Sequence, residues 1–158
     1  MKNHAPAFTL IELLVAVAVI AILAAIAVPN FLEAQTRSKV SRAKADMATL
    51  RTALESYAVD SSSYPVNSSG LGLTGDLYNL TKPVAYISSI PVDPFLHGVF
   101  YFYFSPGKVP GFPDPKFGQY VVACAGPDHF FETTINDSMI YDPTNGTTSR
   151  GDIVVSQR

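Results

Sequence analysis

Cysteine, tryptophan and histidine are scarce in this chain. The one cysteine, Cys124, lies in the apolar run VVACA, so no disulfide can form within the chain and a small buried side chain is expected there. The haem-attachment pattern CxxCH is absent, which excludes a c-type cytochrome. The three histidines, His4, His97 and His129, show neither metal-ligand spacing nor a nucleophile beside them. We interpret His97 and His129 as solvated loop residues.

Charge of either sign is also scarce, and the formal net charge is −2. No overall field therefore draws the chain to nucleic acid. The balance is uneven, because five basic residues face three acids from Glu33 to Glu55, whereas five acids face two arginines from Gly126 to Arg158. A basic, aromatic-bearing patch of the kind that binds DNA is missing, so nucleic acid is not an expected partner.

Two short matches to catalytic patterns carry little information. The segment 70–75 reads GLGLTG, but it follows Asn-Ser-Ser rather than a strand, and no βαβ unit surrounds it. The SxxK match Ser41–Lys44 lies within a helical pattern that offers no pocket. A membrane-tethered hydrolase or solute-binding domain would need convergent polar side chains in a pocket, and we find none. The sequence therefore predicts a protein that is not an enzyme.

What the chain does have is a long apolar run, Phe8–Val28, which contains one acid, Glu12. As a helix this run spans about 30 Å, the thickness of the hydrocarbon core of a bilayer. A carboxylate in such a helix costs about 2–3 kcal/mol at mid-depth and less near the interface. We therefore expect Glu12 to have a partner. A cleavable secretory signal ending at 25–27 (AIA) and a plain single-span anchor are the alternatives, and neither accounts for the acid.

The residues before the run suggest where a partner comes from. A cut between Ala7 and Phe8 would leave an α-ammonium group one helical turn before Glu12. This amine can meet the carboxylate of its own chain or that of a neighbouring chain. In the second case two buried charges are neutralised only on assembly, so the carboxylate sets register and does no catalysis.

The helical pattern continues beyond Pro29, where we predict a kink. Apolar residues then recur at steps of three and four, at Val40, Ala43, Met47, Leu50, Leu54 and Tyr57. We predict one long helix over residues 8–59, transmembrane over 8–28 and amphipathic over 30–59. The apolar stripe is expected to pack on the chain's own head, with a coiled coil between subunits as the alternative. A row of basic residues runs beside the stripe and consists of Arg37, Lys44 and Arg51. These side chains are either solvated or contact acidic residues of a neighbouring subunit.

Residues 60–158 are expected to form an α+β head. The Ser-rich segment 60–65 ends the helix before Pro65. A short helical segment at 77–80 and three strands, at 99–104, 119–125 and 152–156, follow. In the first strand, alternation puts phenylalanines on one face and tyrosines on the other. We expect the phenylalanine face to pack on the helix and the tyrosine hydroxyls to stay near water.

The N-terminal residues resemble a known family. Ala7 followed by FTLIELL, and the apolar run ending in VPNFL, are similar to the N-termini of type IV pilins and type II secretion pseudopilins. The resemblance implies cleavage after Ala7 by a prepilin peptidase, N-methylation of Phe8, and pairing of Glu12 with the Phe8 amine of an adjacent subunit. This chain has Ala7 where the family usually has glycine. The segment around Asp93-Pro94-Phe95 before an aromatic strand resembles major pseudopilins in particular.

The resemblance also implies the fold and the role. The fold would be pilin-like, one long helix packed on a small antiparallel sheet. The chain would be a structural filament subunit, closest to the major pseudopilin of a type II secretion system, with a type IV pilus subunit for adhesion, motility or DNA uptake as the alternative. It would cross the inner membrane once, with its head in the periplasm or outside. Its partners would be other copies of itself, the prepilin peptidase, an assembly platform and minor pilin-like subunits.

The distribution of basic residues alone would predict a cytoplasmic head, opposite to the orientation that the resemblance implies. Lys2 stands alone before the apolar run, whereas Arg37, Lys39, Arg42 and Lys44 follow it. The positive-inside rule would place these four residues, and the head with them, in the cytoplasm. We follow the resemblance and expect an exported head.

Acidic and amide side chains near the C-terminus are the remaining candidates for chemistry: Asp128, Asp142, Asn145 and Asp152. Carboxylate, amide and turn carbonyl oxygens are the ligands that Ca²⁺ prefers. Major pseudopilins resemble this arrangement, with a Ca²⁺-stabilised loop that ends in Asp-Ile. The alternative is that these residues only form turns. Calcium is thus the one cofactor that the sequence suggests.

Overall fold

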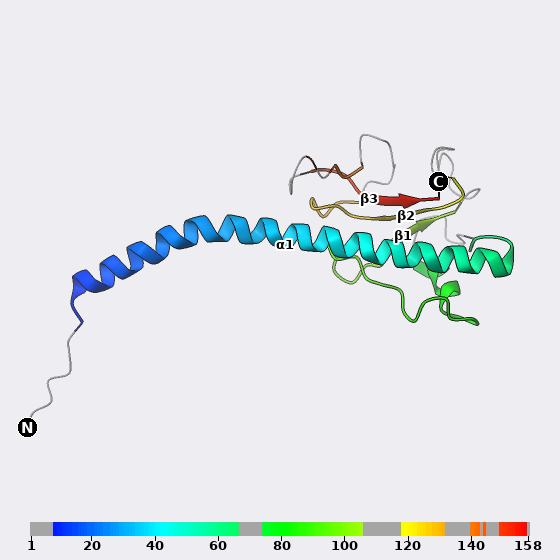
Figure 1. Cartoon of the computed structure of the whole chain (residues 1–158), viewed down its shortest axis with the longest axis horizontal. Helices are drawn as coiled ribbons and strands as arrows, with labels where there is room; N and C mark the ends of the chain where they lie inside the picture. The colour runs from blue at the N-terminus through cyan, green and yellow to red at the C-terminus, as the bar shows by residue number, and fades with distance from the viewer. Residues whose placement is uncertain are drawn as a thin grey trace, which may run out of the picture. The chain divides into compact units, whose positions relative to one another are not determined.

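The structure is a computed structural model that describes residues 8–66, 74–105, 118–131, 140–142, 144 and 149–157. In chain order its elements are helix α1 (Leu10–Ser61), the 3₁₀ helix η1 (Thr74–Leu80), and strands β1 (Phe102–Phe104), β2 (Val121–Cys124) and β3 (Ile153–Ser156) (Figure 1). This confirms the expected α+β, pilin-like fold. The expected leader, residues 1–7, lies outside the described residues.

Helix α1 begins two residues later than expected and ends two residues later, at Ser61. It continues through Pro29, whose missing N–H removes a single backbone hydrogen bond. The kink expected at Pro29 stays a prediction. The chain forms two compact units, Met1–Gln35 and Thr36–Arg158, and the boundary between them lies within α1. The expected division into a helix over 8–59 and a head over 60–158 stays a prediction.

In the first unit the apolar side chains of α1 are exposed. Between Phe8 and Leu32 the large hydrophobic residues have exposed fractions from 50% to 81%. This part of α1 is long and apolar enough to cross a membrane, and none of its apolar window is buried within the protein. Such a surface needs lipid or other helices to cover it.

In the second unit one face of α1 is buried. The stripe predicted from the sequence is buried from Val40 to Leu54, with Tyr57 half-buried beside it. It packs in one cluster with residues of the sheet and of η1, so the prediction that it contacts the chain's own head is confirmed. The segment expected to be helical at 77–80 is the second half of η1.

The sheet has the order β1-β2-β3 with both pairs antiparallel, and it lies beside the second half of α1 (Figure 1). Tyr103 pairs with Val122, and Ala123 pairs with Val154. The central strand, β2, is buried along its whole length. All three expected strands exist, but each is shorter than predicted, with isolated bridges Val92–Phe100 and Ile140–Asp152 beyond them.

The prediction of which strand face meets the helix was wrong. Tyr101 and Tyr103 are completely buried in the cluster that contains the helix stripe. Phe102 and Phe104 lie in a second cluster on the other face, where Phe131 stacks on Phe102 at 3.7 Å between ring centroids. Phenylalanine is the more apolar side chain, but tyrosine can be buried where its hydroxyl finds an acceptor.

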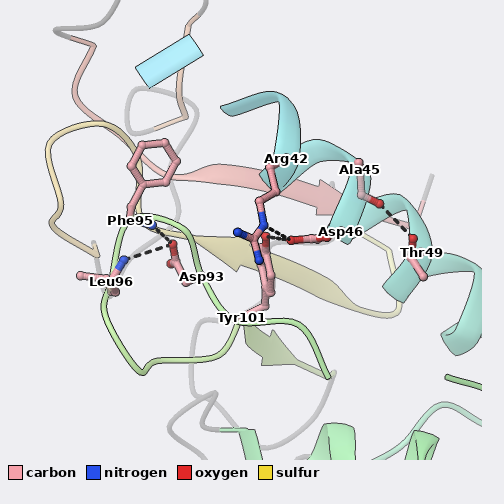
Figure 2. A network of polar contacts seen from close by, with 8 residues as sticks. All are labelled: Arg42, Ala45, Asp46, Thr49, Asp93, Phe95, Leu96 and Tyr101. Atoms are coloured by element: carbon pink, nitrogen blue, oxygen red, sulfur yellow. Dashed lines mark hydrogen bonds and ion pairs between the residues drawn. The ribbon is translucent and has the colours of Figure 1, made fainter. Parts of the chain in front are cut away.

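Each buried tyrosine has such an acceptor. The Tyr101 hydroxyl donates to Asp46 Oδ2 at 3.0 Å, and Arg42 Nε lies 3.6 Å from the same oxygen (Figure 2). The Tyr103 hydroxyl donates to the Pro65 carbonyl at 2.8 Å. Because hydrophobic periodicity does not show where an acceptor will lie, the sequence did not show which face turns inward.

Asp93 joins two segments inside the head. It is 3% exposed, and its Oδ1 accepts from Phe95 N at 2.7 Å and Leu96 N at 3.3 Å (Figure 2). Its Oδ2 accepts from Ala125 N, just after β2, at 3.0 Å. Burial raises the pKa of Asp93, and the three backbone donors work against that rise. Asp93 thus ties the loop before β1 to the end of β2.

Glu55 joins the end of α1 to the sheet in a similar way. Its two carboxylate oxygens accept from the hydroxyls of Tyr64 at 2.8 Å and Tyr120 at 3.1 Å. Gln157 Nε2 donates to the Tyr64 hydroxyl at 2.8 Å, which brings the residue after β3 into the network. Burial and the adjacent Glu55 carboxylate raise the pKa of Tyr64 to about 12.

This raised pKa predicts a loss of stability at alkaline pH. A folded pKa above the ordinary value near 10 means that the neutral Tyr64 hydroxyl contributes stability fully below pH 10 and loses it as the pH rises toward 12. We expect Tyr64→Phe to be less stable than the parent by about 1 kcal/mol at pH 8. That gap should shrink as the pH rises, in denaturant unfolding between pH 8 and 11.5. Tyr78→Phe, which changes an exposed phenol, is the control. A gap that stays constant with pH contradicts the prediction.

Candidate functional site

The first turn of α1 holds Glu12 in a reciprocal hydrogen-bonded cap. Thr9 N donates to Glu12 Oε2 at 2.9 Å, and Thr9 Oγ1 donates to the same oxygen at 2.7 Å. In return Glu12 N donates to Thr9 Oγ1 at 3.3 Å. This is a capping box, in which Thr9 and the residue three positions later satisfy each other's free backbone donors. We call this arrangement the Thr9–Glu12 cap.

The cap gives the acid a partner within its own chain. Both bonds go to Oε2, and Oε1 accepts no hydrogen bond from the described residues. One carboxylate oxygen is therefore open to a second donor, such as an ammonium group. Sequence reasoning missed Thr9, although the T-x-x-E spacing that predicts a capping box was visible in FTLIE.

The other residues of the expected processing site are only partly described. Ala7 lies outside the described residues, and Phe8 is exposed to 74% of its surface. Cleavage after Ala7, methylation of Phe8 and pairing of its amine with Glu12 all stay predictions. Chemically, a carboxylate with one oxygen open to a further donor suits an ion pair.

The expected calcium residues occur on segments that the fold brings side by side. Asp152 forms a parallel bridge with Ile140, and its carbonyl accepts from Tyr141 N at 2.9 Å. Gly126 lies so close to the Gly151 carbonyl oxygen that position 126 has no room for a Cβ. The segments 126–128, 140–142 and 151–152 are thereby neighbours, which the sequence alone did not show.

Asp128 and Asp142 accept local hydrogen bonds within turns, and Asp128 also accepts one from a segment distant in the chain. Asp128 accepts from Phe130 N at 3.2 Å and from Gly151 N at 3.3 Å. Asp142 Oδ1 accepts from the backbone and hydroxyl of Thr144 at 2.8 and 2.7 Å, and these bonds lower the pKa of Asp142. Asp152 is 1% exposed. Asn145 lies outside the described residues. Within the described part of the chain, no three Asp, Glu, His or Cys side chains come close enough to hold an ion.

Cys124 and His129, for which the sequence predicts no chemical role, both have defined contacts in the structure. Cys124 is buried, as expected, and burial raises the pKa of its thiol, so it is an unreactive part of the core. His129 is exposed and lies outside the helices and strands, as expected, and in addition its Nδ1 lies 2.7 Å from the Phe95 carbonyl oxygen and its ring packs edge-on against Phe95. Its φ of 60° lies in the left-handed region, which follows from the Gly126–His129 turn.

Comparison with known proteins agrees with this geometry. Residues 30–141 match the family described as type II secretion system (T2SS), protein G, and residues 2–28 match the prokaryotic N-terminal methylation motif. No solved structure matches the chain significantly. The match to the protein G family covers both the amphipathic half of α1 and most of the head.

Individual relatives support the same assignment. The type II secretion system core protein G of Pseudomonas aeruginosa is 37% identical over 113 residues, which cover 67% of this chain and 78% of that protein. The Escherichia coli protein of the same name is 31% identical over 127 residues, 77% of this chain and 81% of that protein. The type IV major pilin protein PilA of Myxococcus xanthus is 53% identical, but over 57 residues, 36% of this chain and 26% of its own length. The chain therefore belongs to the type II secretion system protein G family and carries the N-terminal methylation motif of that group of filament subunits.

Proposed function

We propose that this protein is the major pseudopilin of a type II secretion system, a structural subunit that polymerises into a filament and has no catalytic role. The observation that carries the proposal is a carboxylate, Glu12, on an apolar helix surface that the protein's own fold leaves uncovered. An uncovered apolar helix is stable in lipid or against other helices, and an acid within it favours a site where a counter-charge is supplied.

Assembly would move the apolar surface of α1 from lipid into contact with the helices of other subunits. In the membrane, lipid covers the side chains from Phe8 to Leu32, and the Thr9–Glu12 cap satisfies one oxygen of the acid. In the filament, helices of other copies would cover the same surface, and the Phe8 amine of an adjacent subunit would reach the open Oε1. Since burial in the fibre only replaces burial in lipid, extraction needs an external motor.

The membrane would be the inner membrane, crossed once by the first part of α1, with the head on the periplasmic side. Processing by a prepilin peptidase would precede assembly on an inner-membrane platform together with minor pilin-like subunits. The methylation-motif match over residues 2–28 supports the processing step. A type IV pilus role is the second candidate. It is less well supported, because the pilin relative aligns over a much shorter stretch than the protein G relatives.

Mass spectrometry of the native N-terminus tests the proposal. We expect the mature chain to begin at Phe8 and to carry one added methyl group on its amine. Cleavage is expected to depend on the prepilin peptidase of the host, so a strain without that enzyme should accumulate the chain starting at Met1. An intact Met1 in the wild-type strain, or a mature start at Val28, would overturn the proposal.

Replacing the acid tests its role in assembly. We expect Glu12→Val to insert into the membrane normally, because the change removes the charge that lipid disfavours, and to form no filaments, because the counter-charge of the Phe8 amine is lost. Electron microscopy and chemical cross-linking of intact cells would measure filaments. Leu13→Val, a change of similar size on the same turn, is the matched control and should assemble. Normal filaments from Glu12→Val contradict the pairing.

We also propose that Ca²⁺ binds to the neighbouring segments 126–128, 140–142 and 151–152. The donor chemistry fits, since carboxylates from Asp128, Asp142 and Asp152 are hard oxygen ligands, and Asn145 would contribute an amide oxygen. The described residues do not by themselves complete a site, so a ligand from outside them, such as Asn145, would be needed. A bound ion would hold the three segments together near the buried Asp152.

Removing calcium should then lower stability. At a calcium concentration one hundred times its dissociation constant, binding contributes about 2.7 kcal/mol, which a chelator would remove. We expect the unfolding midpoint of the full chain in detergent micelles to fall on addition of chelator and to recover with excess Ca²⁺. Asp142→Asn should reduce this difference, whereas Asp60→Asn, whose acid bonds Tyr86 at the end of α1, should not. An unfolding midpoint of the parent protein that does not change on addition of chelator would contradict the proposed calcium binding.

A further inference from the structure

Asn79 begins an acceptor sequence for glycosylation on the surface of the head. Asn79, Leu80 and Thr81 match the pattern asparagine, any residue but proline, then serine or threonine, at which a glycan is attached to the asparagine amide. We propose that Asn79 Nδ2 carries an N-linked glycan that is added while the chain is being exported. The inference rests on the proposed function in one respect, because it requires the head to lie on the exported side of the membrane.

The asparagines of the head are unusual as a group. Every asparagine after residue 59 begins such an acceptor sequence, whereas neither of the two before it does. Those in the head are Asn67, Asn79, Asn136 and Asn145, and the earlier two are Asn3 and Asn30. Serine and threonine make up roughly a fifth of the head, so four matches from four asparagines would arise by chance on the order of once in a thousand such heads. The pattern therefore favours a chemical role for asparagine in this part of the chain.

Asn79 is the one of these four that the structure describes. The other three lie outside the described residues, and Asn145 is already a candidate ligand for calcium. The sequence around Asn79 also differs from a Ser/Thr-rich loop, in which chance matches are frequent. Thr81 is the only serine or threonine from Gly75 to Ile87. We therefore place the site at Asn79.

The 3₁₀ helix η1 points Asn79 away from the core. With three residues per turn, Leu77 and Leu80 lie on the same face of η1, and both are completely buried. Tyr78 and Asn79 lie between them and are exposed, as are residues 82–85 that follow. A glycan on the Asn79 amide would therefore extend into solvent without displacing a buried side chain.

Exposed apolar side chains lie close to Asn79 in the chain. Tyr78 directly precedes it and is 52% exposed, and Val84, in the loop that follows, is 54% exposed. The Tyr78 ring packs edge-on against Phe100, with 6.2 Å between the ring centroids. The negative face of an aromatic ring attracts the polarised C–H groups of a sugar. A glycan on Asn79 would thus cover apolar surface that otherwise faces water.

Hydrogen bonds in the folded head indicate when the glycan would be added. The hydroxyl of Thr81 completes the acceptor sequence, so a transferase has to contact it. In the folded head Thr81 Oγ1 donates to the Tyr78 carbonyl at 2.8 Å, and Thr81 N donates to the same oxygen at 2.9 Å. The Leu80 carbonyl is also engaged, since it accepts from Tyr86 N at 2.9 Å. Transfer should therefore precede closure of this turn, which suits a chain that is still being exported.

The reaction needs an activated sugar from outside the protein. We take the donor to be a sugar whose C1 is bonded to the diphosphate of a membrane polyprenol. Asn79 Nδ2 attacks C1, and the new C–N bond forms as the C1–O bond to the diphosphate breaks. The amide gives up one proton to a base of the transferase, and the polyprenyl diphosphate leaves with the bonding electron pair. A nucleoside diphosphate sugar could supply the same chemistry in the cytoplasm.

Mass spectrometry of one peptide tests the site. Cleavage before aspartate releases peptide 76–92, in which Asn79 is the only asparagine. In protein isolated from its host we expect most copies of this peptide to carry the added mass of a glycan, located on Asn79 by fragmentation. Chain made while membrane insertion is blocked should lack the added mass. If that chain is modified, the donor is the cytoplasmic one, and addition during export is wrong.

Three substitutions separate the acceptor sequence from the fold. Asn79→Gln keeps an exposed amide but lengthens the side chain by one carbon, and it should remove the added mass while the unfolding midpoint stays close to that of unmodified parent protein. Thr81→Val lacks the hydroxyl and should also remove the mass. Thr81→Ser keeps the hydroxyl, so it is the matched control and should stay modified.

The order of transfer and folding can be tested with membranes of the host. We expect them to glycosylate a synthetic peptide of residues 76–92 and to leave the folded, unmodified full chain in detergent unchanged, because its Thr81 hydroxyl is held by Tyr78. Equal modification of the peptide and the folded chain would contradict transfer before folding.

Three results would overturn the glycan itself. These are a peptide 76–92 without added mass in protein from the host, an added mass that persists in Asn79→Gln, and an added mass that is lost in Thr81→Ser. The N-terminal measurement of the proposed function is independent of this peptide. An unmodified peptide from a chain that begins at methylated Phe8 would reject the glycan alone, whereas a modified peptide from a chain that begins at Met1 would reject processing and leave the glycan in place.

Discussion

The burial of one face of α1 under the central strand is the contact on which the rest of the head depends. Residues Met47, Leu50 and Leu54 share a cluster with Val122 and Cys124, and that cluster leaves them no exposed surface. A buried side chain of this kind contributes about 1.5–3 kcal/mol relative to an exposed one. A head with three short strands and no disulfide therefore derives its stability mainly from a helix that also enters the membrane. Anchoring and folding share one element.

Polar groups at the edges of that cluster determine how the strands meet the helix. Asp46 and Glu55 on α1 accept the hydroxyls of Tyr101, Tyr64 and Tyr120, so tyrosine rings fill the interface while their hydroxyls end on charged acceptors. Asp93 performs the corresponding task for backbone donors of two loops. Such bonds stabilise modestly but are costly to leave unmade, which gives the interface a single register.

The first part of α1 differs from the part in the head, because the protein's own fold does not bury it. Its apolar residues are uncovered, and its one acid is partly satisfied by Thr9. One oxygen of Glu12 accepts no hydrogen bond from the described residues and lies near the start of this apolar surface. In our account that oxygen meets the amine of another subunit. This pairing depends on the surface being transferable between lipid and other helices.

Much of this was determined by the sequence itself. The 3.6-residue spacing from Val40 to Tyr57, the apolar run broken by Glu12, and the aromatic strand after Asp93 predicted the helix, its buried face and the α+β class, because these are local patterns of period and composition. Tertiary structure alone decided that Tyr101 and Tyr103 face the helix, that Asp128 lies beside Gly151, and that Asp93 joins two loops. Those outcomes depend on acceptors and close backbone contacts contributed by residues distant in the chain, and no local pattern encodes where such partners meet.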